Sequence, residues 1–227
     1  MLHYVFFGFA RYFFDKTIPS GSRTYAYLPS QRDEDTDERI TPEQVRAKIG
    51  GDAVITTWEY DRTRFLEQLA SHPHIPRFNK HLQQHYRMLS MYYHIQQSLA
   101  MLDSVTLAPD DVIVLTRLDN GLIDTDVPTI LALLRDHDVI VEFITGELAV
   151  NDHYFVMRPS AIPAFKSLYD TYLANYSTFP DTRPEAVIGH YLQHMHQSVA
   201  AAPVVTRVYH HNCTRSCGCA VRRGDYS

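Results

Sequence analysis

The stretch from Asp110 to Gly121 constrains the fold more than any other part of the chain. It reads Asp-Asp-Val-Ile-Val-Leu-Thr-Arg-Leu-Asp-Asn-Gly. An apolar, β-branched run between acidic residues and an Asp-Asn-Gly turn is typical of a buried strand in an α/β sheet. Arg117 and Asp119 follow two residues apart at its carboxyl end, so both can point to the same side, where open α/β sheets bind ligands. A cation and a carboxylate there suit a phosphate-bearing ligand and its metal ion. The alternative is an Asp119 that caps the turn and pairs with Arg117.

Size and charge narrow the class of protein. A chain of 227 residues with 45% hydrophobic residues fits one α/β domain with a sizeable core. The formal net charge of −5 argues against a nucleic-acid-binding surface, which needs clustered Lys and Arg. The apolar start, Met1 to Phe14, has no Lys or Arg before Arg11 and no convincing cleavage site, and no stretch is long enough to span a membrane. We therefore expect a soluble, cytoplasmic protein.

Apolar runs and helical periodicities alternate along the chain, which predicts an α/β fold with a central sheet flanked by helices. Residues 19–40 form the most polar segment, within which 32–39 is predicted to be a solvated loop. Thr41-Pro42-Glu43-Gln44 predicts a helix start with a capping box. The remaining predicted strands are 3–7, 52–59, 139–144, a short strand after Asp152, and 204–209; the predicted helices are 42–49, 62–70, 78–102, 128–135, 159–175 and 184–197.

Other candidate site residues also stand at predicted strand ends. Gly8 follows the first strand and permits a sharp turn or a close approach to a ligand, and Arg11 could then reach a diphosphate or a base. A solvated loop arginine is the alternative for Arg11. Trp58 ends the strand 52–59 and could contact a ligand, or it could cover the sheet edge. Asp152 could act as a general base toward a sugar hydroxyl, or it could form an Asx-turn that starts the next strand.

The end of the chain is separated from the predicted domain. We assign residues 1–211 to one domain and 212–227 to a cysteine-rich tail that holds all three cysteines, Cys213, Cys217 and Cys219. Cys-x-x-x-Cys-x-Cys is not one of the strong zinc spacings, so a reduced tail is the simpler interpretation and a structural zinc the alternative.

Taken in order, these stretches resemble a known family. They are Phe6-Phe7-Gly8-Phe9-Ala10-Arg11, Ala53 to Trp58, Gln84-His85-Tyr86 with Ser90, Val112 to Asp119, Asn151 to Phe155, and Pro184-Glu185. Their order and spacing look like the GT-A-fold glycosyltransferases of bacterial surface-polysaccharide and large-virus capsid-glycan pathways. In that family the organising strand usually ends in Arg-x-Arg-x-Asp or a related Asp-x-Asp variant. Here Leu115 stands in the place of the first Arg, while Arg117 and Asp119 match the pattern.

The resemblance implies a GT-A (Rossmann-like) domain with a mixed, mostly parallel sheet. It implies transfer of a sugar from a nucleotide-diphosphate donor, UDP favoured, to a glycan hydroxyl, with inversion and with Mn²⁺ or Mg²⁺. The implied roles are a catalytic base, Asp152; donor-binding residues Gly8, Arg11, Thr57, Trp58, Gln84, Arg117 and Asp119; and metal ligands Asp119 and His210 or His211. The alternatives are a non-catalytic nucleotide- or glycan-binding protein on a degenerate fold of this type, or a sugar nucleotidyltransferase.

Overall fold

The computed structural model describes residues 1–8, 18–29, 41–59, 62–71, 82–118, 120–124, 127–145, 149–150, 152–175, 183–202 and 205–208. The strands are β1 (Leu2–Phe7), β2 (Arg23–Pro29), β3 (Val54–Trp58), β4 (Val112–Arg117), β5 (Asn120–Asp124), β6 (Val139–Val141), β7 (Ile144–Thr145), β8 (Ala149–Val150), β9 (Tyr154–Met157), β10 (Val199–Ala201) and β11 (Val205–Val208). The α-helices are α1 (Pro42–Ile49), α2 (Arg62–Ser71), α3 (Leu82–Ala100), α4 (Val127–Leu133), α5 (Ile162–Asn175) and α6 (Pro184–His194). Short 3-10 turns at Met101–Ser104 and Pro159–Ala161 follow α3 and precede α5.

Seven strands form the central sheet, in the order β10-β6-β9-β4-β1-β2-β3. β1 pairs in parallel with β2 and β4, β2 with β3, and β10 with β6. β9 alone runs against its two neighbours, β4 and β6. The predicted α/β class, with a mixed and mostly parallel sheet between helices, is confirmed.

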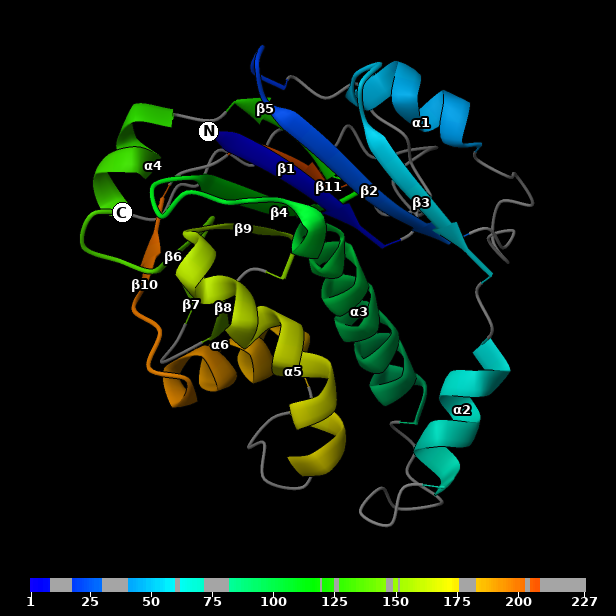
Figure 1. The fold of residues 1–227 in the computed structure, drawn as a ribbon. Helices are drawn as coiled ribbons and strands as arrows, with labels where there is room; N and C mark the ends of the chain where they lie inside the picture. Colours follow the sequence, from blue (N-terminus) through cyan, green and yellow to red (C-terminus); the bar gives the residue numbers. More distant parts are fainter. Residues whose placement is uncertain are drawn as a thin grey trace, which may run out of the picture.

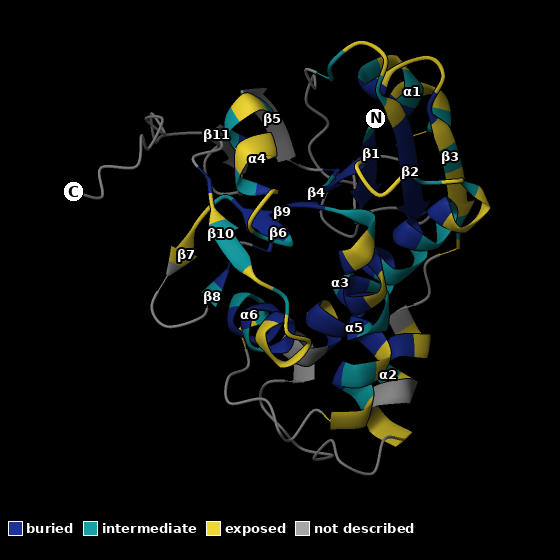
Figure 2. Ribbon diagram, turned by 60° about the vertical axis from the view of Figure 1, so that its left-hand side comes forward, coloured by how far each residue is buried: buried dark blue, intermediate teal, exposed yellow. Residues whose placement is uncertain are grey.

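Helices cover both faces of this sheet (Figure 1). In β1, Val5 and Phe7 join the core on the side of α3, α5 and α6, while Tyr4 and Phe6 join the core on the side of α1 and α4. Successive side chains of a strand point to opposite faces, so a run of consecutive apolar residues is what two-sided burial requires. Figure 2 shows the result: the middle strands are buried and the edge strand β3 is largely exposed.

The first helix begins as its sequence predicts. The Thr41 hydroxyl accepts a hydrogen bond from the Gln44 amide at 3.2 Å, and the Gln44 side chain accepts one from the Thr41 amide at 2.8 Å. This is a complete capping box with Pro42 in the first turn, and the helix stops at Gly50, whose φ is +113°.

The structure corrects several local predictions. Residues 23–29, predicted to be part of a polar connection, form β2, which lies between β1 and β3 and is buried from its second residue onward. Asn120 and Gly121, predicted to lie in a turn, begin β5. The predicted strand 139–144 is divided into β6 and β7, and β8 and β10 were not predicted. The last predicted strand exists as β11, but it pairs with β5 in a separate two-stranded sheet. Strand pairing decides these cases, and local composition does not encode it.

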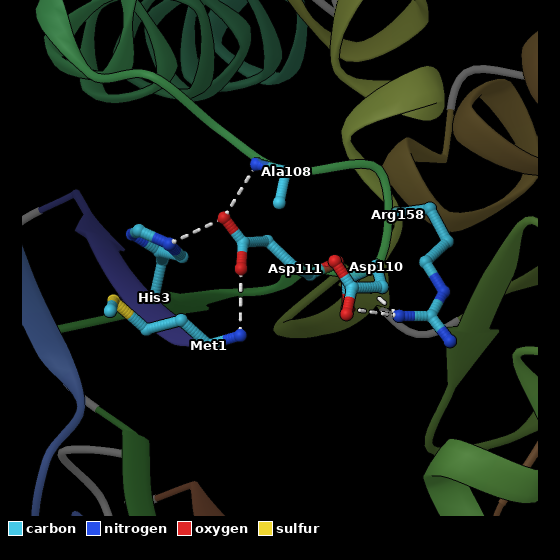
Figure 3. Close-up of polar contacts among 6 residues, drawn as sticks. All are labelled: Met1, His3, Ala108, Asp110, Asp111 and Arg158. Atoms are coloured by element: carbon cyan, nitrogen blue, oxygen red, sulfur yellow. Dashed lines mark hydrogen bonds and ion pairs between the residues drawn. The ribbon is translucent and has the colours of Figure 1, made fainter.

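A polar cluster ties the amino ends of β1 and β4 together (Figure 3). The Asp111 carboxylate accepts hydrogen bonds from the α-amino group of Met1 and from the Ala108 amide, at 2.7 and 2.8 Å. The carboxylate oxygen that accepts from Ala108 also lies 3.3 Å from Nε2 of the buried His3. Arg158 donates to the neighbouring carbonyl of Asp110. This cluster lies at the edge of the sheet opposite to the carboxyl ends of the parallel strands.

Within the part of the chain that the structure describes, no helix combines the length and the apolar character that crossing a membrane needs.

Candidate functional site

Several predicted site residues meet at one edge of the sheet. β1 and β4 are parallel, with Phe7 paired to Arg117, so Gly8 and Arg117 come to the same edge. β9 is antiparallel to β4, with Thr116 opposite Tyr154, so the two residues that precede β9 also lie there. Asp152 and His153 are therefore placed beside Arg117, although about 35 residues separate them in sequence. This is the edge at which α/β sheets bind ligands.

Three side chains form the centre of the site. Nη1 of Arg117 lies 2.8 Å from Nδ1 of His153, and the same Nδ1 lies 3.0 Å from Oδ1 of Asp152. The carbonyl oxygen of His153 accepts hydrogen bonds from the Arg117 amide and from the Thr116 hydroxyl, each at 3.1 Å. The pairing of β4 with β9 thus fixes the backbone of His153. Its ring lies between the guanidinium of Arg117 and the carboxylate of Asp152.

The Asp152 carboxylate is buried and ionised. Its side chain is 7% exposed. Burial by itself raises the pKa of Asp152, but the interactions of the carboxylate with its neighbours His153 and Arg117 outweigh burial and leave this pKa below its usual value. Oδ1 is fully shielded from solvent and accepts no hydrogen bond of good geometry among the described residues. A buried carboxylate oxygen that lacks a donor is a group available to accept a proton or a hydrogen bond from a ligand.

Two residues of the site escaped the sequence analysis. His153 follows Asp152 directly, and an imidazole next to a carboxylate in the sequence is a usable signal for a site residue. Tyr92, in α3, is fully buried, and its hydroxyl lies 3.5 Å from the carbonyl oxygen of Pro184 at the start of α6. Burial raises the pKa of Tyr92, and nearby Tyr172, Asp152 and Glu185 raise it further. Nothing in the sequence around Tyr92 distinguishes it from the other apolar residues of that helix.

Gly8 is required for its backbone conformation. Its φ is +83°, and a Cβ built there would meet no atom within 4 Å. The left-handed conformation, rather than a lack of space, therefore explains the glycine. The extended conformation of β1 ends at this residue.

Trp58 lies at the carboxyl end of the edge strand β3, within a cluster of aromatic rings. It stacks on Tyr27, with centroids 5.8 Å apart and an angle of 14° between the rings. Tyr93 and His94 of α3 approach it to 5.3 Å, and Phe65 of α2 meets it edge-on. These contacts are those of a ring that covers the sheet edge. A role in nucleotide binding stays a prediction, as it does for the exposed neighbour Thr57.

The other predicted site residues are not described by the structure, or are described only in their backbone. Arg11, Asp119, His210 and His211 are not among the described residues, nor are the three cysteines, and of Gln84 only the backbone in α3 is described. Among the described residues, no group of three or more His, Cys, Asp or Glu side chains is placed to hold a metal ion. The proposed metal site thus rests on the sequence.

A cavity of about 730 Å³ lies elsewhere, at the amino ends of β2 and β3. Residues 18–25 and 48–54 line it, together with Met101, Ser104 and Val105. It is at the opposite edge of the sheet from Asp152 and shares no residue with the site.

Comparisons with known proteins add little to this geometry. No family profile matches the sequence, and no curated protein matches it. Among solved structures, the apo crystal structure of mouse xyloside xylosyltransferase 1 matches 88% of this chain and 83% of its own chain. The identity is 8% and the TM-score is 0.44, which assign neither an activity nor a substrate. The chemistry of the site has to come from the residues themselves.

Proposed function

We propose that the protein is a glycosyltransferase that moves a sugar from a nucleotide-diphosphate donor, UDP favoured, to a hydroxyl of a glycan acceptor. The observation that carries the proposal is the placement of Arg117 and the buried Asp152 on either side of His153, at the carboxyl edge of the sheet. This arrangement offers a cation for a leaving phosphate and a carboxylate for a proton. The resemblance of the sequence to GT-A glycosyltransferases supports the same reaction.

In an inverting reaction the acceptor oxygen attacks the anomeric carbon while the bond from that carbon to the diphosphate breaks. Asp152 takes the proton of the acceptor hydroxyl, and the electron pair of the broken bond leaves with the diphosphate. Arg117 lies near the base and can hydrogen-bond a phosphate through its planar guanidinium. The low pKa of Asp152 keeps the carboxylate unprotonated at neutral pH, which a general base requires.

The donor would extend along the carboxyl edge of the sheet. Gly8 ends β1, Arg117 ends β4, and Thr57 with Trp58 ends β3, three strand positions away from β4. Three strand spacings amount to roughly 14 Å, a span comparable with an extended nucleotide sugar. Arg11 and Gln84 complete the proposed donor site.

A divalent cation, Mn²⁺ or Mg²⁺, belongs to the proposal. Asp119 with His210 or His211 would hold it through oxygen and nitrogen donors suited to these ions. When bound, the cation supplies charge neutralisation for the diphosphate.

The test is thermal unfolding with UDP, GDP, CMP and dTDP, each with and without Mn²⁺, followed by nucleotide release from the matching sugar donors. A ligand that binds the folded state raises the Tm by mass action. We expect one nucleotide to stand out and its sugar donors to be turned over in the presence of a glycan. No stabilisation by any nucleotide would reject the proposal. Stabilisation without turnover on any donor would instead favour the non-catalytic binding protein.

A further inference from the structure

The shared contact at Nδ1 of His153 has a chemical consequence. A guanidinium is always protonated and can only donate hydrogen bonds. At 2.8 Å from Nη1 of Arg117, Nδ1 must therefore present its lone pair, and the proton of the neutral ring must reside on Nε2. Nδ1 then has no hydrogen to give to Oδ1 of Asp152, only 3.0 Å away.

An Nδ1 without a hydrogen is consistent with the absence of a hydrogen bond to Oδ1 of Asp152. Its buried Oδ1 lies within reach of Nδ1, yet it accepts no well-formed hydrogen bond from the described residues. Two lone pairs facing each other at this distance repel, and the hydrogen bond from Arg117 to the ring offsets that repulsion. If Arg117 turned to another acceptor, Nδ1 could carry the proton and donate to Asp152 in a charge-assisted hydrogen bond.

We propose that His153 is a positioning residue that couples anion binding at Arg117 to the hydrogen bonding of Asp152. In the unliganded protein, Arg117 donates to Nδ1 and Oδ1 of Asp152 has no donor. When the guanidinium engages a diphosphate, the ring changes to the tautomer protonated at Nδ1, which holds the carboxylate in one orientation. The inference rests on the proposed function in one respect, because the anion is taken to be the diphosphate of the donor.

The surroundings favour movement of the proton rather than of the ring. The carbonyl oxygen of His153 is held by both Thr116 and Arg117, so the backbone is fixed. Among the described residues, Arg117 from β4 and Tyr92 from α3 act electrostatically with Asp152, and Glu185 from α6 and Tyr172 from α5 lie near Tyr92 in turn. Both tyrosines are buried, and Tyr92 stays neutral because burial raises its pKa well above the usual value. Arg117 is the cation whose position decides where the proton of His153 resides.

The test is ¹⁵N NMR of the histidine rings at about pH 8, where neutral imidazole predominates. His153 is assigned among the 13 histidines by its disappearance in His153→Asn. The probe is inorganic pyrophosphate with Mg²⁺. In the wild type we expect an unprotonated Nδ1 that becomes protonated when pyrophosphate is added to saturation. In Arg117→Met, which keeps an unbranched apolar stem but cannot donate, we expect a protonated Nδ1 with and without pyrophosphate.

An Nδ1 that stays unprotonated in Arg117→Met would overturn the shared hydrogen bond. A wild-type His153 signal that saturating pyrophosphate leaves unchanged would overturn the coupling. This readout needs no turnover, so it separates the inference from the proposed function. A protein that changes tautomer but transfers no sugar retains the inference and loses the function.

A second measurement compares two variants of His153. An asparagine amide lies where Nδ1 lies and can donate to Asp152, whereas a glutamine amide corresponds to Nε2. We expect both variants to lower kcat, and His153→Gln to lower it about tenfold or more beyond His153→Asn, a part of what losing a general base costs. Donor KM should change little in either variant. Equal losses of kcat in the two variants would show that the ring serves only packing, and would overturn the proposal.

Discussion

Arg117 and His153 are joined twice across neighbouring strands. The amide of Arg117 donates to the carbonyl oxygen of His153 at 3.1 Å, and its guanidinium lies 2.8 Å from Nδ1 of the same residue. The first contact belongs to the pairing of β4 with β9, and the second belongs to the site. The sheet therefore sets the position of the site directly, without an intervening loop.

Replacing the guanidinium should weaken donor binding without unfolding the protein. In Arg117→Met the backbone hydrogen bond to His153 remains, but the cation that we propose binds the phosphate is lost. We expect the KM for the sugar donor to rise about tenfold or more, because a charge-assisted hydrogen bond contributes about 1.5–3 kcal/mol. Steady-state kinetics check this, with Arg135→Met at an exposed position as the control. An unchanged donor KM would remove Arg117 from the donor site.

Neutralising the proposed base should abolish transfer while leaving the donor bound. We expect Asp152→Asn to lower kcat about 10²- to 10⁴-fold, the usual contribution of a general base. The nucleotide-induced increase in Tm should persist, because the proposed base would act on the acceptor and not on the nucleotide. Asp136→Asn, at an exposed turn, is the matched control. Turnover near the wild-type rate would show that Asp152 is not the base.

The turn after β1 offers a test of backbone strain. Gly8 has a φ of +83°, whereas no positive φ is recorded at Gly51, and a Cβ at either position would meet nothing within 4 Å. Gly8→Ala should lower the free energy of unfolding by about 1–2 kcal/mol, the cost of a left-handed conformation for a residue with a Cβ. Gly51→Ala should be close to neutral. Chemical denaturation of the two variants makes the comparison, and equal effects would contradict it.

The core beneath the site should respond strongly to truncation. Phe155 of β9 is fully buried and packs edge-on against Phe165 of α5, with ring centroids 5.0 Å apart. We expect Phe155→Ala to cost about 3–5 kcal/mol of stability through lost burial and the cavity that remains. Phe143→Ala, at a ring that is 44% exposed, should cost far less. Urea unfolding of both variants measures the difference.

Buried histidine makes stability depend on pH. Burial lowers the pKa of His94 to about 3 from its ordinary value of 6.5. The unfolded chain then binds a proton below pH 6.5 that the folded protein does not bind. The contribution of His94 to the free energy of unfolding is therefore fully present above pH 6.5. It falls as the pH drops toward 3, by about 1.4 kcal/mol per pH unit.

His94→Phe keeps a ring in the aromatic cluster and removes this titration. Between about pH 6 and pH 4, the loss of stability should be less steep in the variant than in the wild type. Equal slopes would show that His94 is protonated in the folded protein. Asp111 acts in a lower range: hydrogen bonding from the Met1 amine holds its pKa at about 2, so its contribution is lost only as the pH falls from 3.8 to 2.

Much of the local structure is contained in the sequence. The continuous apolar run 112–115 predicted a strand buried on both faces, and the capping box at Thr41 predicted the start of α1; both are confirmed. These features depend on neighbouring residues along the chain, whose preferences are visible in a single sequence. The strand β2 was not recognised, because its alternating tyrosines become buried only when β1 and β3 lie on either side.

The tertiary structure decided the composition of the site. The sequence identified Arg117 and Asp152 separately, as polar residues next to predicted strands. Only the antiparallel pairing of β9 with β4 brings them to one edge, with His153 between them. Tyr92 of α3 lies close enough to Asp152 for the carboxylate to raise its pKa. Residues far apart in the chain become neighbours through strand order and direction, which depend on the packing of the whole sheet and on no local signal.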